Sequence, residues 1–74
     1  MIDAGKGLTA MRTDELKKLL LLLHQGHLEG PVSPEGLTVV GFQYRTSLLM
    51  GALRGLSTQG IRAVLVCTLA ERNG

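Results

Sequence analysis

The chain has 74 residues, of which 45% are hydrophobic and 3% aromatic, and its formal net charge is +2. This length allows one domain, and the single cysteine excludes an intramolecular disulfide, which favours a reducing cytoplasmic setting. The leucine run at residues 19–23 is far shorter than the roughly 20 apolar residues that span a membrane. We therefore expect no membrane span.

Apolar residues and charges are both distributed in a way that suggests a partner. The apolar fraction is high for so short a chain, which indicates self-association or binding to another protein. Residues 1–36 have a net charge of −1, whereas residues 37–74 have a net charge of +3. Either the basic half meets phosphates, or unlike halves of two copies meet each other.

The first regular element that we expect is a helix with Thr13 as its N-cap. Acidic residues follow Thr13 in the first turn, and Gly26 stands just past the helix end. Helical spacing places four leucines on one face, namely Leu16, Leu19, Leu20 and Leu23. Leu21 and Leu22 fall off this face and belong either to a generous core or to a partner surface. The weakly patterned residues 1–12 are expected to form a flexible arm ahead of one helical domain over residues 13–74.

The middle of the chain, residues 37–56, has two interpretations. Just before it, Ser33-Pro34-Glu35 matches a helix start, with serine as N-cap and proline in the first turn. As one central helix, the segment places on one side Leu37, Val40, Tyr44, Leu48, Gly51 and Gly55. The two glycines at 51 and 55 would then form a flat strip packed against the first helix. The alternative is a strand from Leu37 to Phe42, then a loop and a helix from Ser47 to Leu56, because β-branched residues favour strands.

Residues 61–72 decide the fold class. As a strand they would be apolar on both faces and would need a covered parallel sheet, yet only one other strand candidate exists. As a helix, these residues would direct five side chains toward the core, namely Ile61, Val64, Leu65, Thr68 and Leu69. Arg72 would lie in the last turn. We therefore predict an all-α fold, a small bundle of three to five helices. An α/β order of helix, strand, helix and strand, completed by dimerisation, is the alternative.

Residues that carry chemistry are few. His24 and His27 form an HxxH pair with Cys67 as a third potential ligand, but zinc needs three or four ligands with supporting partners. In the α/β interpretation, residues 39–53 and 59–66 resemble the nucleophile segment of isochorismatase-type hydrolases, with Ser47 in place of the cysteine. No acid–lysine pair can be placed beside Ser47. We therefore predict no metal, no other cofactor, no enzymatic activity and no small-molecule substrate.

Nucleic-acid binding is the alternative function from a different class. Residues 56–62 have the form of the turn in a helix-turn-helix motif, and the second half of the chain is basic. A recognition helix presents polar side chains to the DNA groove, whereas this one offers Arg62 followed by Val64 and Val66. Aromatic residues for stacking on single strands are also lacking. The pattern therefore disfavours nucleic acid as a partner. The alternatives are a small basic nucleic-acid-binding protein or, in the α/β interpretation, a hydrolase-like fragment.

Laid out as helices, residues 15–72 show a recurring order of features. A leucine-rich helix ends at Gly26-His27-Leu28, and a short acid-started helix follows. The later matching positions are Arg45, Leu48, Leu49, Leu53, Leu56, Gly60, Ala63 and Leu69. This order resembles the later part of a death-fold domain of the caspase-recruitment type, and bacterial effector-associated domains of defence and signalling proteins have the same small helical style. The resemblance implies homotypic assembly, in which stacked copies bring attached effectors together.

The charge split, the apolar excess and this resemblance predict a non-catalytic adaptor module that associates with itself or with a homologous domain. A contact between unlike faces generates open stacks rather than closed dimers. We expect a basic face formed by Arg45, Arg54 and Arg62. We expect an acidic face formed by Asp14, Glu15, Glu29 and Glu35. The expected apolar partner positions are Leu21, Leu22 and Val66.

Overall fold

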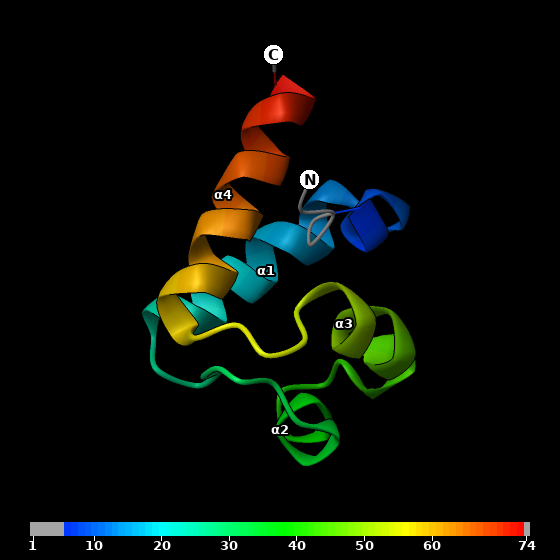
Figure 1. Cartoon of the computed structure of the whole chain (residues 1–74), viewed down its shortest axis with the longest axis vertical. Helices are drawn as coiled ribbons and strands as arrows, with labels where there is room; N and C mark the ends of the chain where they lie inside the picture. The colour runs from blue at the N-terminus through cyan, green and yellow to red at the C-terminus, as the bar shows by residue number, and fades with distance from the viewer. Residues whose placement is uncertain (1–5, 74) are drawn as a thin grey trace.

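The computed structural model describes residues 6–73, which form four α-helices and two short 3-10 helices (Figure 1). In chain order these are η1 (Lys6–Ala10), α1 (Thr13–His24), α2 (Pro34–Val39), η2 (Gln43–Arg45), α3 (Thr46–Ala52) and α4 (Thr58–Asn73). No strand occurs in this range, so the predicted all-α bundle is confirmed and the α/β alternative is wrong. Within the same residues, no helix combines the length and apolar character that a bilayer crossing requires.

The two longest helices, α1 and α4, lie side by side and run in opposite senses, with α2 and α3 at the end away from the C-terminus (Figure 1). Both helices bury most of the apolar stripe that helical spacing predicts. On α1 the buried residues are Leu16, Leu19 and Leu23, whereas Leu20 is only half-buried. On α4 the strand-like composition forms a helix, because one stripe with Ile61 and Leu65 is fully buried against its neighbours. Thr68 in this stripe satisfies its hydroxyl group by donating to the Val64 carbonyl at 2.8 Å.

Two helices end at a glycine with a positive φ angle, namely α1 at Gly26 and α2 at Gly41. Gly26 and Gly41 have φ values of 81° and 86°, in the left-handed region that side chains avoid. After α2, the Phe42 N–H donates to the Leu37 carbonyl at 2.8 Å, and the Gly41 N–H donates to the Thr38 carbonyl at 3.1 Å. This is the pair of hydrogen bonds in a Schellman motif, and it stops the helix. The expected continuous helix over residues 37–56 is therefore wrong, as is the expected strand over 37–42.

The chain beyond Gly41 changes direction because Phe42 enters the core. Phe42 is almost fully buried, whereas Tyr44 is 63% exposed and does not share an inner side with Leu37 as expected. Gly51 and Gly55 are also exposed, and a Cβ added at either would meet no atom within 4 Å. The expected glycine strip against the first helix is therefore wrong.

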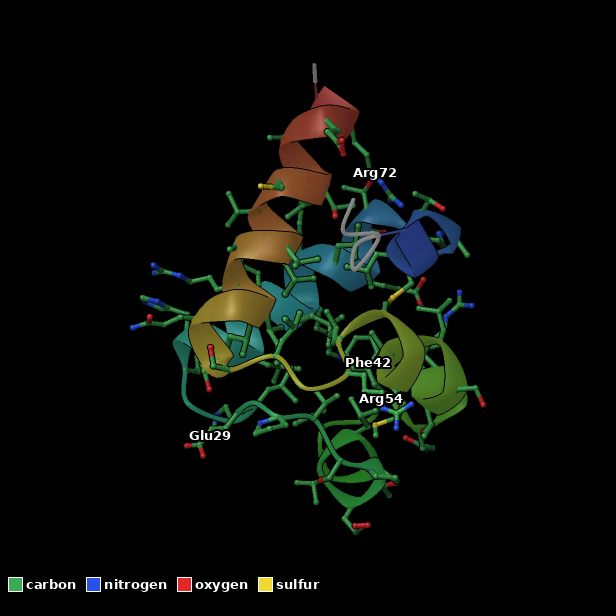
Figure 2. All side chains as sticks on the ribbon, in the orientation of Figure 1. Glu29, Phe42, Arg54 and Arg72 are labelled. Atoms are coloured by element: carbon green, nitrogen blue, oxygen red, sulfur yellow. The ribbon has the colours of Figure 1, made fainter. Side chains whose placement is uncertain are left out.

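The packed chain begins earlier than the sequence analysis predicts. Residues 1–5 lie outside the described range, but η1 follows them, and Leu8 and Met11 are buried in the core. Arg72 at the end of α4 holds this segment, since its Nη2 donates to the Leu8 carbonyl at 3.0 Å and to the Thr9 carbonyl at 3.3 Å (Figure 2). The expected arm over residues 1–12 is thus wrong for residues 6–12.

Candidate functional site

An open groove of about 710 Å³ runs between α1 and α4, beside their buried contact. Its α1 wall is formed by Lys17, Leu20, Leu21 and His24. Its α4 wall is formed by Gln59, Arg62, Ala63, Val66 and Cys67. On each helix these residues are three or four positions apart, which places them in one stripe along the helix surface. The groove is therefore built on two regular elements that the core holds in place.

Some apolar side chains of the groove are exposed, although apolar side chains at nearby positions of the same helices are buried. Leu21 is 53% exposed and Val66 is 48% exposed, whereas Leu19 and Leu65 are fully buried. Both exposed positions were predicted as partner surface, and the structure places them on facing walls of one groove. Exposed apolar side chains are unfavourable in water, and burial of Leu21 and Val66 against a partner would remove this cost.

Basic groups border the groove and have no partner within the described chain. Lys17 and Arg62 are exposed, and no ion pair or side-chain hydrogen bond holds either of them within residues 6–73. None of the lining residues is Asp or Glu. The groove therefore combines an apolar surface with an uncompensated positive border.

Two of the predicted interface residues, Arg45 and Glu15, bind each other within the molecule. Arg45 binds Glu15 through two hydrogen bonds of 3.1 Å, from its Nε to Oε2 and from its Nη2 to Oε1. The Tyr44 hydroxyl group also donates to Glu15 Oε2, at 2.5 Å, and the Arg12 backbone N–H donates to Oε1 at 2.9 Å. Arg45 and Glu15 were expected on opposite faces, whereas the structure joins them and so fastens α1 to η2.

Hydrogen bonding in this cluster changes the acidity of its members. The bonds from Arg45, then Tyr44, then the Arg12 backbone lower the pKa of Glu15 to about 2. The same bond to Glu15 raises the pKa of the Tyr44 hydroxyl group. The Tyr44 ring also stacks on Phe42, with ring centroids 5.9 Å apart, so the cluster continues into the core. These contacts stabilise the fold by linking α1 and η2 to the core.

The remaining predicted interface residues are dispersed. Arg54 and Glu29 lie in the connections after α3 and α1, well apart from each other (Figure 2). Asp14 and Glu35 are exposed in α1 and α2. Leu22 is half-buried and packs against the core. Among the described residues, the structure therefore gathers Leu21, Arg62 and Val66 at one place but forms no single basic or acidic face from the others.

Sequence reasoning missed six members of the groove, namely Lys17, Leu20, His24, Gln59, Ala63 and Cys67. The helical spacing of Lys17, Leu20, Leu21 and His24 is a usable signal, because it places them along one side of α1. The facing stripe on α4 could not be paired with it, because that pairing depends on how the two helices pack.

The structure also places the residues considered for metal binding and catalysis. His24 and Cys67 line opposite walls of the groove, and His27 lies beyond Gly26. Within residues 6–73, no three His, Cys, Asp or Glu side chains gather closely enough to hold a metal ion. Ser47 is exposed in the first turn of α3, after a 3-10 turn instead of the strand that a hydrolase nucleophile segment requires.

Comparison of the chain with family models, with curated proteins and with solved structures gave no match. Functional inference therefore rests on the groove, on the basic groups that border it and on the contrast with the internally paired cluster around Glu15.

Proposed function

We propose that this domain is a non-catalytic protein–protein interaction module, an adaptor that associates with itself or with a like domain through the α1–α4 groove. The observation that carries this proposal is the position of Leu21 and Val66, two exposed apolar side chains on facing walls of one groove. Burying apolar surface on a partner gains about 25 cal/mol per Å². Lys17 and Arg62, which have no ion pair among residues 6–73, supply orientation and charge selectivity.

The resemblance of residues 15–72 to caspase-recruitment death-fold domains and bacterial effector-associated domains supports an adaptor role in signalling or defence. In such an assembly the basic groove of one copy would meet an unlike, acidic surface of the next, which extends the stack. Asp14, Glu29 and Glu35 are exposed at separate places on the surface, so each of them is a separate candidate for that contact. A reducing cytoplasm suits a chain whose single cysteine, Cys67, is exposed.

Light scattering over a range of protein concentrations tests the proposal. The mass of the wild-type chain should rise with concentration, and Val66→Asp should return it to the monomer value because a carboxylate enters the apolar contact. Val39→Asp is the matched control, since Val39 is 83% exposed on α2, outside the groove. This control should associate as the wild type does.

Two results would contradict the proposal. A wild-type chain that stays monomeric at every concentration, with Val66→Asp changing nothing, removes the homotypic assembly. Equal disruption by Val66→Asp and Val39→Asp removes the groove as the contact surface.

A further inference from the structure

We propose that the α1–α4 groove receives about two turns of an acidic amphipathic helix from the partner protein. This inference rests on the proposed function and names the chemistry of the partner surface. Three properties of the groove lead to it, namely its shape, its apolar lining and its charge.

The shape of the groove selects among the ways in which proteins bind peptides. Strand addition requires a free sheet edge, and residues 6–73 contain no strand. Recognition of extended proline-rich segments uses grooves lined by aromatic side chains, and no lining residue here is Phe, Tyr or Trp. Two helical walls instead leave room for a third helix to pack between them. A helix is therefore the secondary structure that the groove accommodates.

The length of the groove sets the length of its occupant. The lining extends from Lys17 to His24 on α1 and from Gln59 to Cys67 on α4. At 1.5 Å per residue these walls are about 10–12 Å long, which corresponds to roughly two helical turns. Ala63 near the middle of the α4 wall is small, so a large apolar side chain can approach between Leu21 and Val66. Apolar residues at i, i+3, i+4 and i+7 of the occupant match this surface.

Charge selects acidic flanks on the occupant. Lys17 borders the groove on one wall and Arg62 on the other, and no acidic residue lines it. Two identical grooves packed face to face would bring like charges together, which is unfavourable. A helix with Glu or Asp on both sides of its apolar stripe would instead pair with Lys17 and Arg62. These two side chains are available because, within residues 6–73, neither has an ion pair.

A synthetic peptide is a direct probe of this groove. The peptide has about 14 residues, roughly 21 Å as a helix, with leucines in one stripe and glutamates on both sides of it. Cys67 reports occupancy in the unmodified chain, because it is the only cysteine, is exposed and lines the groove. At a protein concentration where the chain is monomeric and a peptide concentration near ten times Kd, alkylation of Cys67 should slow about tenfold. Fluorescence anisotropy of the labelled peptide gives Kd in parallel.

Matched peptides and variants distinguish specific binding in the groove from nonspecific electrostatic attraction between the peptide and the protein surface. A scrambled peptide with its leucines spread around the helix, and a peptide with lysine in place of glutamate, should each bind at least about tenfold more weakly. The double variant Lys17→Glu, Arg62→Glu should weaken binding about tenfold or more, and added salt should weaken wild-type binding. Arg54→Glu, an exposed arginine outside the groove, should leave Kd unchanged. Circular dichroism and urea unfolding confirm that each variant is folded.

The proposal is overturned if the scrambled or the lysine peptide binds as tightly as the acidic helix, or if bound acidic peptide leaves Cys67 unprotected. It is also overturned if duplex DNA protects Cys67 more strongly than the peptide and the double variant abolishes that protection. Its failure is distinguishable from that of the proposed function. If Val66→Asp abolishes self-association but the acidic peptide does not bind, the interaction module stands and its acidic helical partner does not.

Discussion

The α1–α4 pair has two apolar faces with different surroundings. The inner face, with Leu19 and Leu65, is completely covered, whereas Leu21 and Val66, each close by on the same helix, remain about half exposed. Leu65 and Val66 are consecutive residues of similar character, so apolar character alone does not separate buried from exposed positions. The direction in which the helix turns each side chain separates them.

The basic residues show the same division. Arg45 and Arg72 are held by acceptors inside the chain, whereas Lys17 and Arg62 border the groove without an intramolecular partner among residues 6–73. Arg62 and Arg72 belong to the same helix. One arginine therefore serves stability, and the other is available for binding.

The largest expected effect is on the free energy of unfolding, when a residue of the buried face is compared with its exposed neighbour. Leu65→Ala should lower the free energy of unfolding by about 2–5 kcal/mol, because it leaves a cavity in a fully buried site. Val66→Ala should change it by less than about 0.5 kcal/mol. Urea unfolding followed by circular dichroism measures both. Similar losses at the two positions would mean that the outer face also belongs to the core.

A second comparison uses two glycines, one in a covered contact and one in solvent. A Cβ at Gly30 would lie 2.4 Å from the Leu56 carbonyl oxygen and 2.7 Å from the Thr58 nitrogen, so Gly30→Ala should cost about 2–3 kcal/mol. Gly51→Ala has no atom within 4 Å of the new Cβ and lies in α3, so it should stabilise by about 0.5–1 kcal/mol. Thermal unfolding should therefore shift in opposite directions. A Gly30→Ala variant as stable as the wild type would contradict the packing of residue 30 against the start of α4, and a less stable Gly51→Ala variant would contradict the open surroundings of Gly51.

The third comparison concerns the two arginines of α4. Arg72→Ala should destabilise by about 1–2 kcal/mol because it removes the hydrogen bonds to the Leu8 and Thr9 carbonyls and to the Thr13 hydroxyl group. Arg62→Ala should change the free energy of unfolding by less than about 0.5 kcal/mol. Chemical unfolding of both variants checks this difference, and equal losses would show that Arg62 is not free for a partner.

The smallest expected effect is the pH dependence that Glu15 contributes. Its folded-state pKa of about 2 lies below the ordinary value of 4.5, so its stabilisation is fully present above pH 4.5 and is lost as pH falls toward 2. Glu15→Gln should therefore be less stable than the wild type near pH 6, and the difference should shrink on acidification. Arg45→Leu should reproduce the effect because it removes the main cause of the shift. Unchanged pH dependence in both variants would contradict a role of this cluster in stability.

Local signals predicted the parts of the fold that depend on nearby residues. Gly26 ends α1 as expected, and Ser33 caps α2 by accepting from the Gly36 N–H at 3.1 Å. The break at Gly41 was missed, because a glycine can interrupt a helix or be tolerated within it. Its role here depends on burial of Phe42, which is a tertiary contact. Packing of Leu8 was missed for the same reason, since Arg72 holds that segment from the other end of the chain.

The candidate site was predictable only in part. Leu21 and Val66 were recognised because they fall outside the inward stripes of their helices. The groove itself requires the pairing of two helices that the sequence separates by more than thirty residues. The bond between Glu15 and Arg45 was also hidden, because charge counting along the chain cannot show that a negative and a positive residue neutralise each other.

The Arg72 contact also has a consequence for the lifetime of the folded domain. It joins residues 64 positions apart, and closing so long a segment of chain is entropically costly until the intervening helices have packed. We therefore expect this contact to form after the rate-limiting step of folding. A contact absent from the transition state leaves the folding rate almost unchanged and slows unfolding. Arg72 would thus govern how rarely the domain opens, and with it how seldom the buried leucines of α1 and α4 meet water or a protease.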